Sequence, residues 1–170
     1  MEEVVLVNPS GIKMGTMEKM EAHQKGLLHL AFSIFLFNTN GDMLIHQRAA
    51  GKYHSPNLWT NTCCSHPRPG EDFLDATKRR LQEEMGMSCM VDEAFSFIYK
   101  AKLDQGLTEH ELDFVYAGIS DDEPDPNEEE VQAYQYISIS ELDAWIEKSP
   151  NDFTAWFKIC YPELKAKLKL

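Results

Sequence analysis

The chain has 170 residues, a length typical of one domain. A chain of this size buries about 70% of the surface that its unfolded form exposes, so it can fold without disulfides or a structural metal. Sixteen Lys and Arg against 28 Asp and Glu give a net charge of −12. Because so acidic a surface repels the phosphates of nucleic acids, we expect no nucleic-acid partner.

The sequence also indicates where the protein works. Its longest apolar stretch, residues 31–37, is far shorter than the about 20 residues that span a bilayer. The first residues, Met-Glu-Glu, lack the cationic and apolar regions of a secretory signal. These features predict a cytoplasmic protein with no membrane partner. Its four cysteines are then expected to be thiols, since Cys63 and Cys64 are adjacent and cytoplasmic chains rarely form disulfides.

The first part of the chain has the pattern of strands. Residues 4–7 enter an Asn-Pro-Ser-Gly turn, and a short alternating run over residues 14–17 follows, which predicts an N-terminal hairpin. Residues 31–37 and 43–46 predict a second hairpin, because the Asn-Gly pair between them supplies the positive φ angles of a tight turn.

The period then changes from that of a strand to that of a helix. Apolar and small residues at Leu74, Thr77, Leu81 and Met85 share one helical face, and Gly86 follows at the position of a left-handed C-cap. This pattern predicts a helix over residues 72–85.

The second half combines strands and helices. Strands are predicted over residues 94–103, 109–119 and 131–137, and the acidic segment 121–130 is expected to be a solvated loop. Ser140 and Asp143 resemble a capping box at the start of the next helix.

A last helical region covers residues 153–170, and Pro162 is expected to interrupt or restart it. The order of elements predicts an α/β sandwich in which helices flank a mixed sheet.

Residues 60–67, Thr-Asn-Thr-Cys-Cys-Ser-His-Pro, are the most unusual segment. In an extended chain Cys64 and His66 point to one face and Cys63 to the other. A thiol beside an imidazole suits an activated nucleophile, an acid or a Zn²⁺ site. A small buried hydrophobic residue is the ordinary alternative for a cysteine, and it stays open.

Charged residues form two further patterns. Arg80 and Glu84 lie four residues apart on the predicted helix, a spacing usual for exposed ion pairs. On a strand, Glu109 and Glu111 share one face at a spacing suited to a common metal, although solvent-facing carboxylates on an edge strand are more common. Two further histidines lie upstream, and spacing alone does not decide whether these residues meet.

Together these segments resemble the type 1 isopentenyl-diphosphate isomerases. The match extends from about Val5 to the final helix and includes the segments His29-Leu-Ala-Phe-Ser, Leu58-Trp-Thr-Asn, Cys64-Ser-His-Pro and Glu109-His-Glu. The core also resembles the Nudix fold, with signature residues in register at Glu71, Arg79, Leu81, Glu83, Glu84 and Gly86. It departs from that signature at Ser65, where the signature has Gly, and at Arg80, where it has Glu.

The resemblance implies a fold and a domain organisation. The fold is an α/β (α+β) protein, a Nudix-like α/β/α sandwich with a mixed sheet. Residues 1–170 would form a single Nudix-like isomerase domain, with an N-terminal hairpin or extension over residues 1–27 and a Nudix core over residues 28–165.

The departure at Arg80 bears on the reaction. Nudix hydrolases use carboxylates on this helix to hold divalent cations that activate water. An arginine in place of one glutamate removes a metal ligand and supplies a fork suited to phosphate oxygens. The helix is therefore expected to hold a diphosphate without cleaving it.

The resemblance also implies an activity, the interconversion of isopentenyl diphosphate and dimethylallyl diphosphate by protonation and deprotonation in isoprenoid precursor biosynthesis. A Nudix-type diphosphohydrolase is the alternative, and a metal-bound structural or interaction module is a third interpretation.

The resemblance also implies site residues. Carried over residue by residue, the catalytic set is Cys64, Glu111, Tyr99 and Trp156. The ligands of one Mn²⁺ or Zn²⁺ type ion would be His23, His29, His66, Glu109 and Glu111. Glu84 would bind Mg²⁺, and the diphosphate would contact Lys19, Arg48, Lys52 and Arg80.

Overall fold

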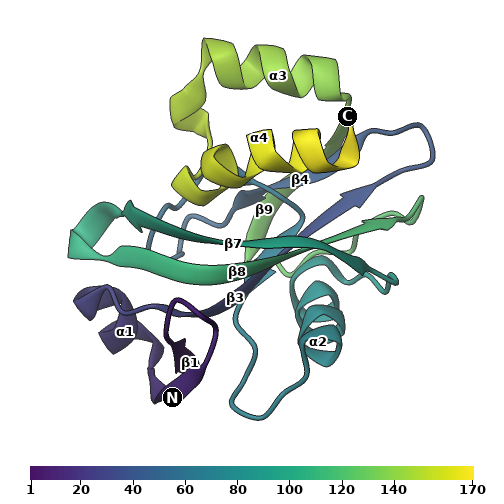
Figure 1. The fold of residues 1–170 in the computed structure, drawn as a ribbon. Helices are drawn as coiled ribbons and strands as arrows, with labels where there is room; N and C mark the ends of the chain where they lie inside the picture. The colour runs from purple at the N-terminus through teal and green to yellow at the C-terminus, as the bar shows by residue number, and fades with distance from the viewer.

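The computed structural model describes residues 1–170, and its main feature is a nine-stranded mixed sheet with helices on both sides (Figure 1). The strands are β1 (Glu3–Val7), β2 (Lys13–Glu18), β3 (His29–Phe37), β4 (Met43–Arg48), β5 (Trp59–Thr60), β6 (Cys63–Ser65), β7 (Asp92–Lys102), β8 (Thr108–Ile119) and β9 (Val131–Ile137). The helices are α1 (Lys19–Lys25), α2 (Phe73–Met85), α3 (Ile139–Lys148) and α4 (Ala155–Leu168), with short 3₁₀ turns at Asp104–Gly106 and Pro150–Asp152.

Strand β3 is at the centre of the sheet, and every one of its residues is buried. Its almost continuous apolar run fits a strand that is covered on both faces. β3 pairs in parallel with β8 along its whole length, from His29 opposite Glu111 to Phe37 opposite Ile119, and antiparallel with β6. The pairing of β3 with β8 and β6 brings together segments that are far apart in the sequence.

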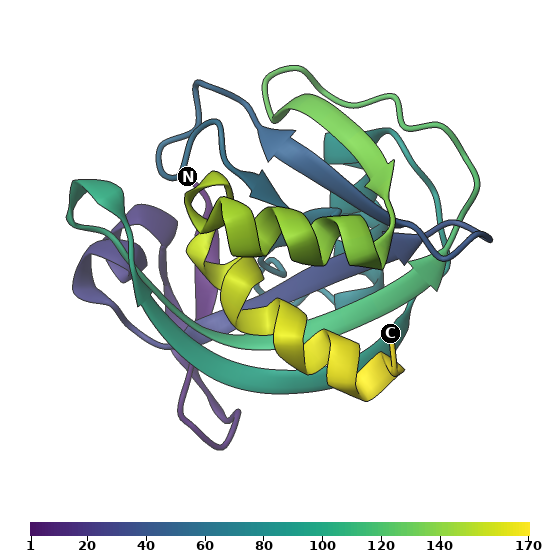
Figure 2. The same ribbon diagram turned by 90° about the horizontal axis from the view of Figure 1, so that it is seen from above.

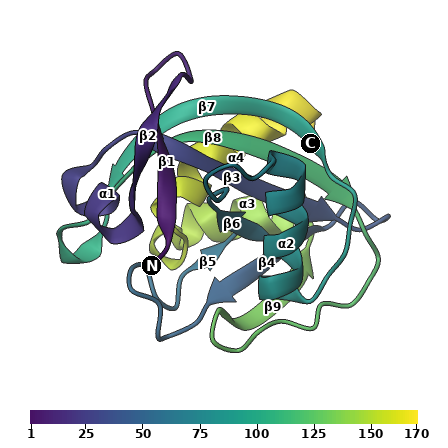
Figure 3. The same ribbon diagram turned by 90° about the horizontal axis from the view of Figure 1, so that it is seen from below.

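The two faces of β3 pack on different helices. Phe32 and Ile34 join Leu81 of α2 in one core cluster. Phe35 joins Phe157 of α4 in a second cluster, which also includes Leu142 of α3. Figures 1 and 2 show α3 and α4 on one face of the sheet, and Figure 3 shows α2 on the other. The predicted α/β/α sandwich with a mixed sheet is confirmed.

Helix α2 has the ends that its sequence predicts. The Asp72 side chain accepts a hydrogen bond of 2.8 Å from Leu74 N, and Gly86 ends the helix with a φ of 63°. A Cβ at Gly86 would lie 2.2 Å from the carbonyl oxygen of Asp125, so both the backbone conformation and the neighbouring loop require glycine there.

Several expectations about the strands and turns need qualification. The N-terminal hairpin is formed by β1 and β2, but helix α1, which follows it, was not predicted. β3 and β4 form a ladder only at Phe37 and Met43 and then diverge, because β3 continues along β8 while β4 pairs with β9 and β5. In the second predicted hairpin, the two strands are therefore paired next to the turn but not further along their length.

Two expectations about helices α3 and α4 were wrong. The N-cap of α3 is Ser138, not Ser140, since Ser138 Oγ accepts from Glu141 N at 3.3 Å. Helix α4 runs through Pro162 without interruption. The loss of one backbone donor is tolerated there because the neighbouring Phe157, Tyr161 and Leu164 are buried in the core.

All four cysteines are free thiols, as predicted. None of the helices combines the length and the apolar character that crossing a membrane requires.

Candidate active site

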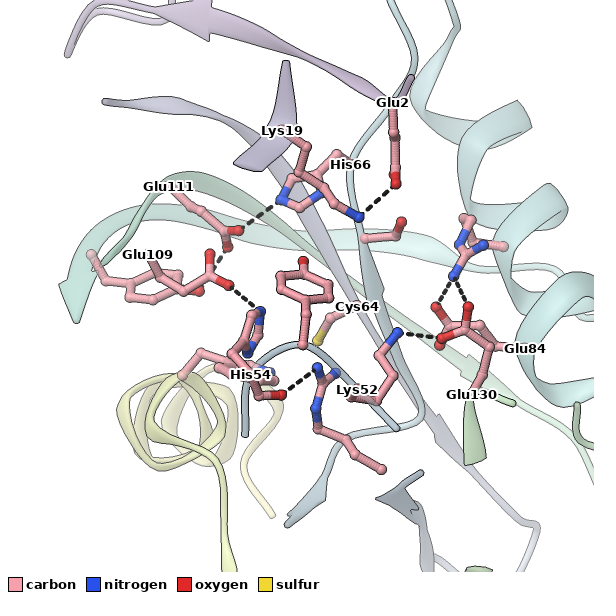
Figure 4. Close-up of a pocket in the computed structure, with 16 residues that line it drawn as sticks. Glu2, Lys19, Lys52, His54, Cys64, His66, Glu84, Glu109, Glu111 and Glu130 are labelled. Carbon is pink, nitrogen blue, oxygen red and sulfur yellow. Dashed lines mark hydrogen bonds and ion pairs between the residues drawn. The ribbon is translucent and has the colours of Figure 1, made fainter. Parts of the chain in front are cut away.

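A polar cavity of about 110 Å³ opens beside β6, β8 and the start of α1. Its walls are mainly charged and hydrogen-bonding side chains. Figure 4 shows Lys52, Glu84 and Glu130 on one side, His54, Glu109 and Glu111 on the other, and Cys64 between them. The lining residues are Glu2, Lys19, Arg48, Lys52, Tyr53, His54, Cys64, Ser65, His66, Arg80, Glu84, Tyr99, Glu109, Glu111, Glu130 and Trp156.

The three histidines and two glutamates that the family resemblance assigned to one metal site do meet in space. One potential ligand atom from each of them lies within 4.8 Å of those from all the others: His23, His29, His66, Glu109 and Glu111. They come from α1, the start of β3, the residue after β6, and β8. The alternation of β8 puts both glutamates on one face, and the parallel register places His29 directly opposite Glu111.

Hydrogen bonds fix the orientation of the imidazoles. His23 Nδ1 lies 2.7 Å from the Lys19 carbonyl oxygen, and His29 Nδ1 lies 2.8 Å from that of Leu27. A carbonyl only accepts, so in both rings Nδ1 donates and Nε2 is left with a lone pair. That lone pair points into the cluster, where His29 Nε2 is 3.3 Å from His66 Nε2.

The cluster has the character of a metal site. His23 Nε2 and Glu109 Oε2 are buried and have no hydrogen-bond partner, which is costly unless a cation completes the site. Histidines whose Nδ1 is bonded to a carbonyl are the usual arrangement around a bound metal. A mixed set of imidazoles and carboxylates therefore fits a divalent transition-metal ion.

The electrostatics of Glu109 and His66 agree with that fit. Burial alone would raise the pKa of Glu109, but neighbouring Glu111, His23 and His54 lower it well below its usual value. Burial lowers the pKa of His66, although Glu111 opposes the effect. A charged Glu109 and a neutral His66 are the forms that bind a metal ion.

Cys64 and Cys63 face opposite sides of β6, as predicted. Cys64 lines the cavity and donates a hydrogen bond of 2.9 Å to Asn61 Oδ1, whereas Cys63 is fully buried in the core beside α2. Burial raises the pKa of the Cys64 thiol, and the nearby carboxylate of Asp113 raises it further. The Cys64 thiol therefore holds its proton at neutral pH.

Tyr99 and Trp156 complete the wall of the cavity near these groups. The Tyr99 hydroxyl donates to Glu111 Oε2 at 2.7 Å, and the two residues are paired across β7 and β8. Burial and the charge of Glu111 raise the pKa of Tyr99 well above its usual value, so this hydroxyl remains a donor. Trp156, from the first turn of α4, carries the Arg48 guanidinium over its ring at 5.2 Å.

The cavity also contains the four cations that the resemblance assigned to a diphosphate. They are Lys19, Arg48, Lys52 and Arg80, and all four line the cavity. Three of them are paired with carboxylates inside it. Lys19 pairs with Glu2 at 2.5 Å, Lys52 contacts Glu130, and Arg80 contacts the buried Glu84. The Arg80–Glu84 pair is thus not the exposed ion pair that its spacing alone would favour.

Five lining residues were not predicted as part of a site: Glu2, Tyr53, His54, Ser65 and Glu130. Glu130 belongs to the segment expected to be a solvated loop, but it contacts Lys52 and lies 3.5 Å from Arg80. His54 lies in the loop between β4 and β5, where no periodicity marks it. Tertiary contacts alone place these residues, so no signal in the local sequence could have found them.

Comparison with known proteins first defines the class. The sequence of residues 27–157 matches the family model of the NUDIX domain. The crystal structure of DR0079 from Deinococcus radiodurans superposes with a TM-score of 0.71 at 20% identity, covering 86% of this chain and 90% of that one. A MutT protein from Methanosarcina mazei Go1 gives a TM-score of 0.68 at 15% identity, covering 84% of this chain and 96% of that one. The fold is that of a Nudix-domain protein.

Curated relatives narrow the class. An isopentenyl-diphosphate Delta-isomerase from Pectobacterium atrosepticum is 49% identical over 95% of this chain and 90% of its own length. Isopentenyl-diphosphate Delta-isomerase 2 from Aromatoleum aromaticum is 45% identical over 94% of this chain and 84% of its own. The chain belongs to this family of Nudix-domain isomerases, and it is therefore an enzyme.

Proposed function

We propose that the cavity binds isopentenyl diphosphate and converts it into dimethylallyl diphosphate, a precursor of isoprenoids. The observation that carries this proposal is that two proton carriers, the Cys64 thiol and the Glu111 carboxylate, line one cavity together with four cations. Lys19, Arg48, Lys52 and Arg80 would bind the diphosphate oxygens, and the five-carbon chain would extend between Cys64 and Glu111.

The reaction moves a double bond by one carbon and needs no oxidant. A proton adds to the terminal methylene carbon, and a proton leaves the internal methylene carbon, so atoms and charge balance over the cycle. Cys64 and Glu111 come from different strands, β6 and β8, and each would handle one of these protons. The direction of the reaction decides which of them donates.

Tyr99 and Trp156 would support the proton transfers. The Tyr99 hydroxyl holds one oxygen of Glu111, which fixes the carboxylate and stabilises its charged form. The indole face of Trp156 would stabilise positive charge that develops on the tertiary carbon. Because water quenches a carbocation, we infer that Trp156 and the N-terminal segment cover the bound substrate.

Two divalent ions would complete the site. His23, His29, His66, Glu109 and Glu111 would hold one ion of the Mn²⁺ or Zn²⁺ type, and Glu84 would hold Mg²⁺ beside the diphosphate. When bound, these ions supply positive charge that fixes the Glu111 carboxylate and neutralises the diphosphate.

The residues at α2 argue against the hydrolase alternative. A Nudix hydrolase places a metal-binding glutamate where this chain has Arg80, and the Arg80 guanidinium here contacts Glu83 and Glu84. A guanidinium at this position suits phosphate oxygens and binds no metal ion. We therefore expect bound diphosphate to remain intact.

The proposal is tested by incubating the purified protein with isopentenyl diphosphate and Mg²⁺ and following the carbon skeleton by NMR. The dimethylallyl isomer should accumulate to equilibrium, and starting from dimethylallyl diphosphate should give the same mixture. Glu111→Gln, which keeps the size of the side chain, should abolish the conversion. Release of phosphate or diphosphate without isomer would overturn the proposal.

A further inference from the structure

His54 is a buried histidine that the proposed catalytic and metal-binding sets do not use. Its side chain is 4% exposed, and it lines the cavity from the loop between β4 and β5. The loop is held in place from both sides. Arg48 Nη2 donates to the His54 carbonyl oxygen at 3.0 Å, and Ser55 N donates to Asp104 Oδ1 at 3.0 Å.

The backbone at this point adopts an uncommon conformation. Ser55 has a φ of 48°, in the left-handed region that residues other than glycine rarely occupy. Such a conformation is strained and persists only where surrounding contacts require it. Here the strained residue directly follows His54, which lines the cavity.

The partners of His54 set its tautomer. His54 Nε2 lies 3.3 Å from Glu109 Oε1 (Figure 4). Its Nδ1 lies 3.3 Å from Ser55 Oγ. A charged carboxylate only accepts, so Nε2 carries the hydrogen and Nδ1 accepts from the Ser55 hydroxyl. This is the reverse of His23 and His29, whose Nδ1 atoms donate to carbonyls. In its neutral form His54 therefore presents a donor at Nε2, where neutral His23 and His29 present a lone pair.

The two carboxylate oxygens of Glu109 contact different histidines, His23 and His54. Oε2 is buried without a hydrogen-bond partner and lies 3.3 Å from His23 Nε2, inside the metal-ligand cluster. The other oxygen, Oε1, lies 3.3 Å from His54 Nε2. We propose that His54 is a positioning residue that holds Glu109 Oε1, so that Glu109 presents Oε2 alone to the bound divalent ion.

The same ring reaches the aromatic wall of the cavity. The His54 and Trp156 rings meet edge to face with their centroids 5.5 Å apart, and Tyr53 packs edge to face on His54 at 4.4 Å. His54 thus lies between the Glu109 carboxylate and the Trp156 indole, which both line the cavity. Its removal should loosen both groups, with the larger effect on the metal, because a carboxylate that loses its outer partner typically weakens metal affinity about 10–100-fold.

The inference rests on the proposed function only in taking Glu109 as a metal ligand, and its test measures metal binding itself. Metal-free protein is titrated with Mn²⁺, and the free ion is measured by electron paramagnetic resonance. His54→Leu, which fills the space without a donor, should weaken Mn²⁺ binding about 10–100-fold. His54→Gln, which keeps an N–H donor, should restore most of the affinity.

A matched control comes from the neighbouring strand. His110 lies between the two glutamates on β8 but points to the opposite face, where its Nδ1 lies 3.0 Å from the Gly26 carbonyl oxygen. His110→Leu should therefore leave the Mn²⁺ affinity unchanged. Wild-type affinity in His54→Leu would overturn the proposal, and so would equal losses in the Leu and Gln variants.

A second measurement does not depend on any variant folding. In ¹⁵N-labelled wild-type protein loaded with Zn²⁺, the ring nitrogen shifts report the tautomer of each histidine. His54 should carry its hydrogen on Nε2, whereas His23 and His29 should carry theirs on Nδ1. A hydrogen on Nδ1 of His54 would contradict the proposal. If the same sample binds metal with these tautomers but does not isomerise isopentenyl diphosphate once Mg²⁺ is added, the proposed function fails and the role of His54 stands.

Discussion

Tyr99 and Glu111 face each other across β7 and β8, and the Tyr99 hydroxyl donates to Glu111 Oε2 at 2.7 Å. The other oxygen of Glu111, Oε1, lies 2.9 Å from His66 Nε2 in the metal-ligand cluster. Glu111 is thus the one residue that joins the cluster to a phenol donor. A carboxylate held at both oxygens keeps a fixed position while its protonation changes.

Tyr99→Phe should lower kcat about 10–100-fold with little change in KM, because the variant loses only the donor to Glu111. Steady-state kinetics give both constants, and thermal unfolding checks the fold. Tyr116→Phe is the matched control, since Tyr116 is buried in the core beside α2, away from the cavity. Equal kcat values for wild type and Tyr99→Phe would exclude the role of Tyr99 in proton transfer.

The two adjacent thiols should differ in what they contribute. Cys64→Ala removes the proposed proton carrier, which lines the cavity, and should abolish turnover. Cys63→Ala empties a small buried space and should lower the free energy of unfolding by about 1–2 kcal/mol while most activity remains. Turnover and denaturant unfolding measure the two effects. A similar loss of rate in both folded variants would show that Cys64 has no special role.

His66 should be required for the bound metal. Its Nε2 lies 2.9 Å from Glu111 Oε1 and 3.3 Å from His29 Nε2, so His66→Ala removes a central ligand atom. Elemental analysis of the purified variant should find much less Mn²⁺ or Zn²⁺ than in wild type, and activity should fall with it. His110→Ala serves as the control. A His66→Ala protein that retains a full equivalent of metal would remove His66 from the ligand set.

His46 should make the protein less stable in acid. It is buried, and burial together with the charge of Arg48 lowers its pKa to about 4. An unfolded histidine titrates near pH 6.5, so below that pH the unfolded chain binds a proton that folded His46 does not. The free energy of unfolding should therefore fall by about 3 kcal/mol as the pH drops from 7 to 4.

Denaturant unfolding at several pH values measures this effect, and His46→Asn isolates it. The variant should lose this part of the pH dependence whatever its absolute stability. The same acid slope in both proteins would show that folded His46 titrates normally.

Local patterns predicted the elements whose signals lie close together in the sequence. Asp72 and Gly86 mark the ends of α2, and strand alternation puts Glu109 and Glu111 on one face of β8. Other features depend on contacts between distant segments. β4 leaves β3 because β8 and β9 offer longer partners, and the seven-residue α1 is too short for a clear helical period.

The residues of the candidate site also fall into two groups, those that the local sequence predicts and those that depend on contacts between distant segments. Strand alternation alone predicts that Cys64 and His66 share a face, because both belong to one short extended motif. His54 and Glu130 lie in loops and contact residues that are distant in the sequence. His54 contacts Glu109, and Glu130 contacts Lys52. Their ionic and polar contacts form only when the chain is folded.

Isomerisation in heavy water tests the central claim most directly. The enzyme, isopentenyl diphosphate and Mg²⁺ are incubated in D₂O, and product is analysed by NMR while phosphate and diphosphate release are assayed in parallel. Because the acid exchanges with solvent between turnovers, the methyl group formed by protonation should carry deuterium, and both release assays should stay at background. Steady release of phosphate or diphosphate without deuterium in the carbon chain would contradict the account and favour a hydrolase.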